Sequence, residues 1–440
     1  MGKVVSDGSK KGGLGFLVCA AAAVFYCYEY LLRITPSIMV DELAATFQAN
    51  ATQIGLLSAS FYFVYTPMQL VVGLLSDYFG SRRVLLAAIV SCVMGSILFS
   101  NAANLATAYL GRGMIGFGSA FAFVGSIKLA SAWLSRSYIS LFVGLTTALG
   151  MLGAILQTNV LPRVMHTIGW HQVIHIGTWV GLLLLLLCYF VLYDSPASWV
   201  AAHGATNGQQ LDKNGEIITD GPERLSFGAV WNNLLRVITT TKIWISGTIA
   251  GVLYLSLSMV AELWGIPLLT ELYHLSAAEA ATSCSMIYLG WLVGGPLVGY
   301  LGARFNVRKI LVTGLLSSGT IITTIIYWPN LFNLLSCRIA LCLFGVTSSV
   351  EVLCFDLSNR YAPTEAVATA TSFTNCLVML GGFVTQPLIG AVLDFNAGNA
   401  EMVGGELMTS YSAANYQWAF MFLPLMLVAG LILTRYLRSE

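Results

Sequence analysis

Long apolar stretches separated by short polar turns run along almost the whole chain. Each stretch is close to the ~20 residues that a helix needs to cross the hydrocarbon core of a bilayer. The pattern predicts an all-α membrane protein with twelve transmembrane helices, at about residues 14–35, 52–76, 84–101, 104–130, 139–161, 171–193, 243–266, 279–303, 308–327, 331–357, 366–393 and 414–436.

One long polar segment, residues 194–242, stands between the sixth and seventh helices. Glycine, asparagine and aspartate in its middle predict a flexible linker. Residues 227–238 place apolar side chains at helical spacing, which predicts an amphipathic helix on the membrane surface. The chain thus divides into a cytoplasmic N-terminus at 1–13, a six-helix bundle at 14–193, a cytoplasmic linker at 194–242, a second bundle at 243–436 and a cytoplasmic C-terminus at 437–440.

Composition supports a membrane protein. Charged residues make up 9% of the chain, against about 25% in soluble domains. The net charge of +1 and the lack of a long basic run argue against nucleic acid as a partner. All nine cysteines fall inside apolar stretches, so we interpret them as small core residues rather than disulfides or metal ligands.

Lysine and arginine fix the expected orientation, because they gather on the cytoplasmic side of membrane proteins. The turn at 73–83 carries Arg82 and Arg83 between the second and third helices. With this turn inside, all but four of the 21 lysines and arginines lie in cytoplasmic segments or at cytoplasmic span ends. The exceptions are Arg33, Arg112, Arg163 and Arg338. Both termini are therefore predicted to be cytoplasmic.

The two six-helix bundles repeat each other. Residues 73–83 match residues 299–309, and the same separation carries Arg112 onto Arg338. Two related halves joined by a cytoplasmic loop are typical of a carrier whose site lies between the halves near mid-membrane.

These motifs resemble those of the major facilitator superfamily (MFS) of secondary transporters. The turn at 73–83 is similar to the family's loop between helices 2 and 3, residues 112–118 to its helix 4 motif, and residues 169–171 to its Gly-Trp-Arg opening of helix 6, with His171 in place of arginine. Residues 144–153 lack the Gly-Pro pair of the drug antiporter motif. The resemblance implies a monomeric carrier without enzymatic activity or cofactor, which alternately exposes a central site lined by helices 1, 4, 7 and 10.

Charges within the spans are costly and therefore predict function. Glu29, Arg112 and Arg338 lie at similar depths in helices 1, 4 and 10, and we expect them to bind the substrate. An aromatic wall is expected from Tyr26, Tyr30, Tyr62 and Tyr288. The alternative is that Glu29 neutralises Arg33 or Arg112 as a fixed structural pair.

Two further carboxylates, Glu262 and Glu351, have no basic residue within one helical turn in the sequence. They are the predicted proton-coupling residues, with sodium coupling as the alternative. We also expect Arg33 to pair with Glu262 when the outer side closes, and Lys128 to pair with Asp356 when the inner side closes. The alternative for Lys128 and Asp356 is that they extend into interfacial water.

By resemblance, Asp77 would contact Arg82, Arg83 and the N-terminus of helix 11 near Ala366 when the inner side is closed. The repeat of this turn has Ala303 in place of the acid. The predicted contact is therefore a latch present in one half only.

No catalytic set occurs, and His171 and His175 lack a third ligand for a metal. The sequence predicts an integral multi-pass protein of the bacterial inner membrane. Its lipid-embedded fold is expected to import a small anionic or zwitterionic metabolite, such as an amino acid, short peptide or organic acid, together with protons. The alternatives are an MFS exporter of a siderophore or drug, and a sensor built on the transporter fold.

Overall fold

The computed structural model describes residues 8–196, 198–199, 227–397, 401–403, 406–408 and 411–437. Within these residues, twelve helices are long and apolar enough to span a membrane. The predicted all-α architecture of twelve transmembrane helices is therefore confirmed.

The helices of the N-terminal half (the N-half) supply the first six spans. The fourth span combines two helices, and a short helix follows the first span. Their bounds are α1 (Gly8–Ile34), the 3-10 helix η1 (Thr35–Ile38), α2 (Val40–Phe47), α3 (Ala51–Phe79), α4 (Ser81–Ser100), α5 (Leu105–Ser119), α6 (Ala122–Trp133), α7 (Arg136–Ile168) and α8 (Trp170–Val191).

The C-terminal half (the C-half) is preceded by the amphipathic helix α10 (Phe227–Ile238) and carries a short hairpin, β1 (Glu401–Val403) with β2 (Glu406–Met408). Its other elements are α11 (Thr241–Leu255), the π-helix η2 (Ser256–Trp264), α12 (Gly265–Tyr273), α13 (Ala277–Gly302), α14 (Val307–Tyr327), η3 (Pro329–Leu331), α15 (Leu334–Ser348), η4 (Ser349–Glu351), α16 (Val352–Tyr361), η5 (Thr364–Ala366), α17 (Val367–Asn396), α18 (Ala413–Phe420), α19 (Phe422–Leu433) and η6 (Thr434–Tyr436).

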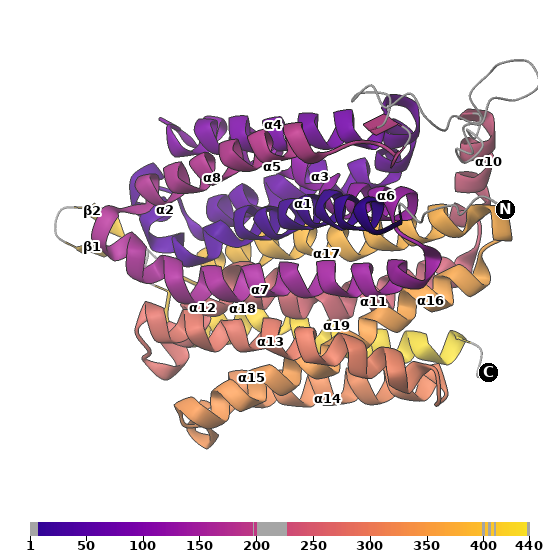
Figure 1. The fold of residues 1–440 in the computed structure, drawn as a ribbon. Coiled ribbons are helices and arrows are strands. Elements are labelled where there is room, and N and C mark those ends of the chain that lie inside the picture. The colour runs from indigo at the N-terminus through magenta and orange to yellow at the C-terminus, as the bar shows by residue number, and fades with distance from the viewer. Residues whose placement is uncertain are drawn as a thin grey trace, which may run out of the picture.

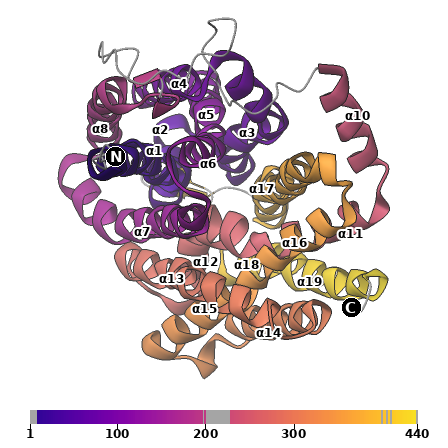
Figure 2. The same ribbon diagram turned by 45° about the vertical axis from the view of Figure 1, so that its right-hand side comes forward.

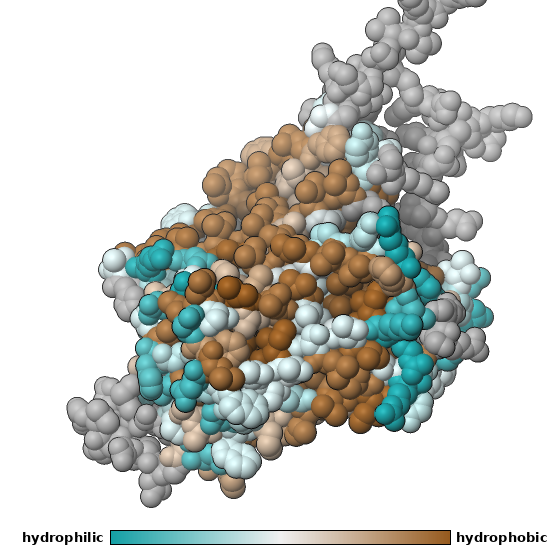
Figure 3. Space-filling model, turned by 90° about the horizontal axis from the view of Figure 1, so that it is seen from below, coloured by the Kyte–Doolittle hydropathy of each residue, from teal (hydrophilic) through white to brown (hydrophobic). Residues whose placement is uncertain are grey.

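The spans run side by side along one axis (Figure 1). The start of α1 and the end of α19 lie at the same end of the bundle, together with α10; we call it the termini end. Helix α2 and the hairpin lie at the opposite, distal end. On the face in Figure 3, apolar side chains form a broad band with polar side chains at its two ends. This distribution fits a bilayer around the middle of the bundle.

Four spans that the hydrophobic pattern presents as continuous are interrupted. The fourth span breaks between Ser119 and Ala122, the tenth at η4 and the twelfth at Met421, while η2 introduces π-helical turns into the seventh. The spans as wholes stay apolar on average, so hydropathy alone does not reveal these breaks. π-Helical turns are frequent at functional sites.

The halves meet along two pairs of helices, α3 with α17 and α7 with α13 (Figure 2). Glycines let the backbones of α3 and α17 approach closely. A Cβ atom on Gly55 would lie 2.5 Å from the carbonyl oxygen of Gln386, and one on Gly390 would collide with that of Ala51. Small residues give tight contacts between helices in membranes, where packing rather than water drives association.

We expect Gly390→Ala to destabilise the closed packing of α3 on α17, because the added methyl group meets backbone that cannot move aside. Overpacking of this kind costs about 1–3 kcal/mol. The thermal unfolding midpoint of the purified protein in detergent should therefore fall. Gly295→Ala is the control, since a Cβ there has no neighbour within 4 Å. An unchanged midpoint for Gly390→Ala would contradict the described approach of the two helices.

Candidate functional site

An ion pair lies at the centre of the molecule, on one face of α1. Glu29 and Arg33 are one helical turn apart and are both fully buried, at 0% and 2% exposure. The Nε and Nη2 atoms of Arg33 donate to Oε1 of Glu29 at 2.8 and 2.5 Å. The second interpretation of Glu29, a pair with Arg33, therefore describes its contact in this state.

The pair is connected to the C-half through Tyr254. Nη1 of Arg33 donates to the Tyr254 hydroxyl at 3.0 Å, and that hydroxyl donates to Oε1 of Glu262 at 3.2 Å. The expected direct contact between Arg33 and Glu262 is thus replaced by a bridge, because the tyrosine hydroxyl lies between them.

Glu262, buried in the π-helical turns of η2, also accepts a hydrogen bond from the Tyr62 hydroxyl of α3. Hydroxyls from both halves therefore hold this carboxylate. We call Glu29, Arg33, Tyr62, Tyr254 and Glu262 the central network. Two of its hydrogen bonds, Arg33 to Tyr254 and Tyr62 to Glu262, cross between the halves.

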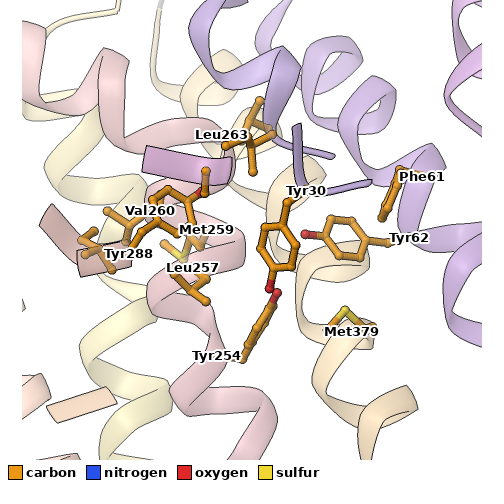
Figure 4. Close-up of a cluster of buried hydrophobic side chains, with 14 of the residues drawn as sticks. Tyr30, Phe61, Tyr62, Tyr254, Leu257, Met259, Val260, Leu263, Tyr288 and Met379 are labelled. Atoms are coloured by element: carbon orange, nitrogen blue, oxygen red, sulfur yellow. The ribbon is translucent and has the colours of Figure 1, made fainter. Parts of the chain in front are cut away.

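Aromatic rings surround the guanidinium of Arg33. Its carbon Cζ lies 4.7 Å from the ring centre of Tyr30, 5.0 Å from that of Tyr65 and 5.4 Å from that of Phe61. Such contacts stabilise a cation more strongly when water is excluded. In Figure 4, the hydroxyls of Tyr30 and Tyr254 point toward each other across the interface, and that of Tyr62 points toward Tyr30.

The two other predicted wall residues differ in their surroundings. Tyr26 packs edge-on against Tyr30, with ring centres 5.2 Å apart. Tyr288 of α13 is fully buried, and its hydroxyl has no hydrogen-bond partner among the described residues. It therefore offers an unused polar group deep in the C-half.

Arg112 has a structural contact that explains its position. Pro36 lacks the N–H that would bond to the carbonyl of Leu32 in a continued helix. Arg112 replaces that donor: Nη1 bonds to the Leu32 carbonyl at 2.7 Å, and Nη2 bonds to the Arg33 carbonyl at 3.0 Å. Arg112 thus anchors the end of α1 that carries the central network.

The repeat mate of Arg112 does not share this environment. Arg338 is only half-buried on α15 and donates to the Ser283 hydroxyl of α13 at 3.2 Å. The repeat in sequence therefore does not extend to equivalent contacts: Arg112 holds backbone carbonyls of the first span, whereas Arg338 donates to a side chain of the eighth.

The distal end is closed by a carboxylate of the C-half. Asp394, in the last turn of α17, accepts from the backbone N–H groups of Ala51 at 3.0 Å and Thr52 at 2.9 Å, the first residues of α3. The hydroxyls of Thr52 and Tyr411 also donate to it. A carboxylate at a helix N-terminus is stabilised by ~0.3–1 kcal/mol because the first amides have no acceptor and carry the positive end of the dipole. We call these contacts the Asp394 clasp.

At the termini end, Asp356 pairs with Arg360 of its own helix at 2.8 Å, and both side chains are about half exposed. The expected pair with Lys128, which is half-buried on α6, is therefore not the contact that Asp356 makes here. Glu351 lies in η4 and is 4% exposed. It has no hydrogen-bond partner among the described side chains.

The predicted latch is described only in part, since the side chain of Asp77 lies outside the described residues. Arg83 is exposed. Arg82 contacts the end of α8: its Nη2 donates to the Tyr189 carbonyl at 2.8 Å, and its guanidinium lies over the Tyr193 ring. The backbone N–H of Arg82 donates to Asp194 at 2.7 Å. Arg82 thus has its partners in the last turn of α8 and in the residues directly after it.

Sequence reasoning missed Tyr254, Tyr65, Asp394 and Asp194. The tyrosines lie in apolar runs, where nothing in one sequence separates them from lipid-facing aromatics. Asp394 and Asp194 each lie at the end of a span, where a polar residue is also expected simply because the helix leaves the membrane there. Among the described residues, no group of three or more His, Cys, Asp or Glu side chains could hold a metal.

Comparison with known proteins identifies the family of this chain. The sequence model of the Major Facilitator Superfamily matches residues 16–386. The chain belongs to this family of membrane transporters, which are not enzymes.

Two relatives and two solved structures that each match most of the chain illustrate this similarity. The chain is 21% identical to a "Probable sulfoacetate transporter" of Cupriavidus necator over 86% of this chain and 87% of that one. It is 22% identical to a D-galactonate transporter of Escherichia coli over 87% and 90%. The fold is similar to an inward-facing, unoccupied bacterial homologue of the human lysosomal transporter Spinster, with a TM-score of 0.74, 14% identity and 98% of both chains covered. It is also similar to a D-xylose–proton symporter, with a TM-score of 0.69, 14% identity and coverage of 94% and 97%.

We expect Asp394→Asn to shift the protein toward a state open at the distal end. The amide keeps one acceptor oxygen but loses the charge that the first turn of α3 stabilises. Loss of a helix cap costs typically ~1 kcal/mol, which corresponds to a roughly five-fold change in the populations. Spin labels at the exposed distal positions Ala103 and Leu331 should report a larger fraction of long distances.

Glu279→Gln is the matched control for this measurement. Glu279 is a carboxylate that also lies at a helix start near the distal end, but its partner, Ser276, belongs to the same helix. If both variants changed the distances alike, the Asp394 clasp would not be a contact that controls opening between the halves.

Proposed function

We propose that the protein is a secondary transporter that imports a small organic anion together with a proton by alternating access. Arg33 binds the anion and Glu262 carries the proton. The observation that carries this proposal is the central network, in which one guanidinium and two carboxylates are joined across the two halves without water-exposed charge.

The charges in this region balance. Arg33 and Arg112 are cations, and Glu29 and Glu262 are carboxylates; all four are buried. A proton on Glu262 leaves one positive charge in excess, and an anionic substrate restores neutrality. Because uncompensated charge in a low-dielectric interior is unfavourable, binding of the proton favours binding of the anion.

Opening of the distal end links this binding to the conformational change. The bonds from Arg33 to Tyr254 and from Tyr62 to Glu262 must break when the halves separate there. Each break removes a partner from a buried charged group, which is costly. A substrate anion on Arg33 and a proton on Glu262 replace these partners, so the loaded protein changes state more readily than a half-loaded one.

The other predicted residues fit supporting roles in this scheme. Glu29 holds Arg33 in place, Arg112 anchors α1, and Tyr26, Tyr30 and Tyr288 line the site. Glu351, buried at η4, is a second proton candidate on the path to the termini end. Asp77, Lys128 and Asp356 are the residues we expect to close the termini end in the opposite state, when Asp394 releases α3.

The class of substrate is supported by the names of relatives. Those that cover most of the chain include transporters of sulfoacetate, D-galactonate and galactarate or D-glucarate, all small organic anions. Orientation rests on the distribution of lysine and arginine, which places the termini end in the cytoplasm and the closed distal end outside. We place the protein in a bacterial inner membrane, acting as a monomer.

We expect Glu262→Gln to abolish uphill uptake driven by a pH gradient while retaining exchange of labelled for unlabelled anion. The amide is a permanent mimic of the protonated acid, so substrate can still bind and cross, but no proton travels with it. Proteoliposomes tested with sulfonates, aldonates and aldarates provide the measurement. Arg33→Gln should lose both activities by ~10-fold or more, since a charge-assisted contact is worth about 1.5–3 kcal/mol.

Glu271→Gln, on α12 of the same span but outside the central network, is the control and should transport like the unmodified protein. Uptake that does not depend on the pH gradient but does depend on a sodium gradient would show that the coupling ion is sodium and not the proton. Anion accumulation only when the direction of the pH gradient is reversed would identify the protein as an exporter. Unchanged transport by Arg33→Gln would refute the assigned anion site.

A further inference from the structure

A cavity within the N-half lies apart from the interface between the halves. It has a volume of about 370 Å³ and is lined by residues of α1, α4, α5, α7 and α8. Phe99, Ile115 and Ile174 form buried parts of its wall, so most of the lining is apolar. Its size falls within the range of pockets that hold small organic ligands.

The cavity opens toward the lipid. Leu156 and Val160 of α7 and Ile176 and Val180 of α8 line it and are 46–59% exposed. Val180 stands ten residues after the start of α8, or ~15 Å along the helix at 1.5 Å per residue. The opening between α7 and α8 therefore lies within the hydrocarbon layer rather than at the water surface.

Three polar atoms among the lining residues have no partner among the described residues: Oγ of Ser96, Nε of Arg112 and Oε1 of Gln157. Nε of Arg112 is an unused donor, because the Nη atoms of the same guanidinium hold the carbonyls of α1. Oε1 of Gln157 is an unused acceptor, because the amide nitrogen donates to the Thr35 hydroxyl at 3.0 Å. The side chains of Arg112 and Gln157 are both 1% exposed. Unsatisfied buried polar atoms are rare and call for a partner.

We propose that this cavity is a binding site for a free long-chain fatty acid that enters from the bilayer between α7 and α8. In its neutral, protonated form, the carboxyl group accepts from Nε of Arg112 and donates its O–H to Oε1 of Gln157. The alkyl chain fills the apolar part of the cavity and extends through the opening between α7 and α8 into the bilayer. A carboxylic acid suits the pair because it presents an acceptor and a donor on one small group.

A water molecule is a weaker explanation of the same features. Water would satisfy these polar atoms, but buried water needs two to four polar partners at each position. Apart from hydroxyls such as that of Ser96, most of the remaining lining is apolar and offers few such partners, and hydrocarbon is the solvent at the cavity's mouth. A headgroup attached to an alkyl chain accounts for both parts.

The site is independent of the proposed transport cycle but contacts it at one residue. Arg112 holds the end of α1 that carries Arg33 and Glu29. A fatty acid on Nε would therefore stabilise the position of Arg112 without occupying the space between the halves.

The test uses palmitic acid carrying a diazirine in its chain, added to the full-length protein in liposomes and activated by light. We expect labelled peptides to map to α7 and α8 near the cavity mouth, and unlabelled palmitic acid to compete. The methyl ester of the same probe cannot donate to Gln157, so its labelling there should fall roughly five-fold, as expected for one lost hydrogen bond.

Two matched glycine variants separate the cavity from the lipid-facing surface in general. A Cβ at Gly177 or at Gly144 has no neighbour within 4 Å, but only Gly177 lines the cavity. Gly177→Leu should fill the mouth and reduce labelling, whereas Gly144→Leu should leave it unchanged. Gln157→Leu should also reduce it.

Labelling spread evenly around the lipid-facing belt would overturn the proposal. Equal labelling by the acid and the ester would also overturn it, since the site would then hold only an acyl chain. If the leucine variant failed to fold, competition and peptide mapping in the unmodified protein would still decide the question.

Discussion

Charge inside hydrocarbon is the constraint on which the rest of this structure depends. A guanidinium or carboxylate far from water must be matched by an opposite charge or by hydrogen-bond donors and acceptors. Here the matching groups come from both halves, since Arg33 reaches Tyr254 and Glu262 reaches Tyr62. The two halves can therefore separate at this level only if something else replaces those partners.

The antiparallel pair of α3 and α17 connects the two ends of the bundle and so links closure at one end to opening at the other. Both helices run the length of the bundle, so the last turn of each lies beside the first turn of the other. At the distal end the last turn of α17 supplies Asp394 to the first turn of α3. The sequence predicts the reciprocal contact at the other end, with Asp77 of α3 near the start of α17. Because Gly55 and Gly390 let the two helices approach closely, the position of the end of α17 relative to the start of α3 is fixed.

Much of the fold could be predicted from the sequence, because span length and hydropathy are properties of single segments. The twelve spans and the family resemblance needed no tertiary information. The central network did not follow in the same way. Glu29 and Arg33 are recognisable by their spacing. Glu262, however, lies in the π-helical turns of η2 and is joined to Arg33 through Tyr254, and nothing in the apolar sequence marks either feature. Likewise, the repeat relates Arg112 to Arg338, while their partners depend on Pro36 in one half and Ser283 in the other.

The contact between Arg112 and the end of α1 makes the residue types at positions 36 and 112 depend on each other. Pro36 removes an amide hydrogen, and Arg112, on a different helix, supplies its replacement at the Leu32 carbonyl. A lineage that lost the arginine alone would leave a bare carbonyl in a dry interior. A lineage that lost the proline alone could restore the ordinary helical bond, and the guanidinium would then compete with it. The two positions should therefore tend to change together or not at all, although 75 residues separate them in the chain.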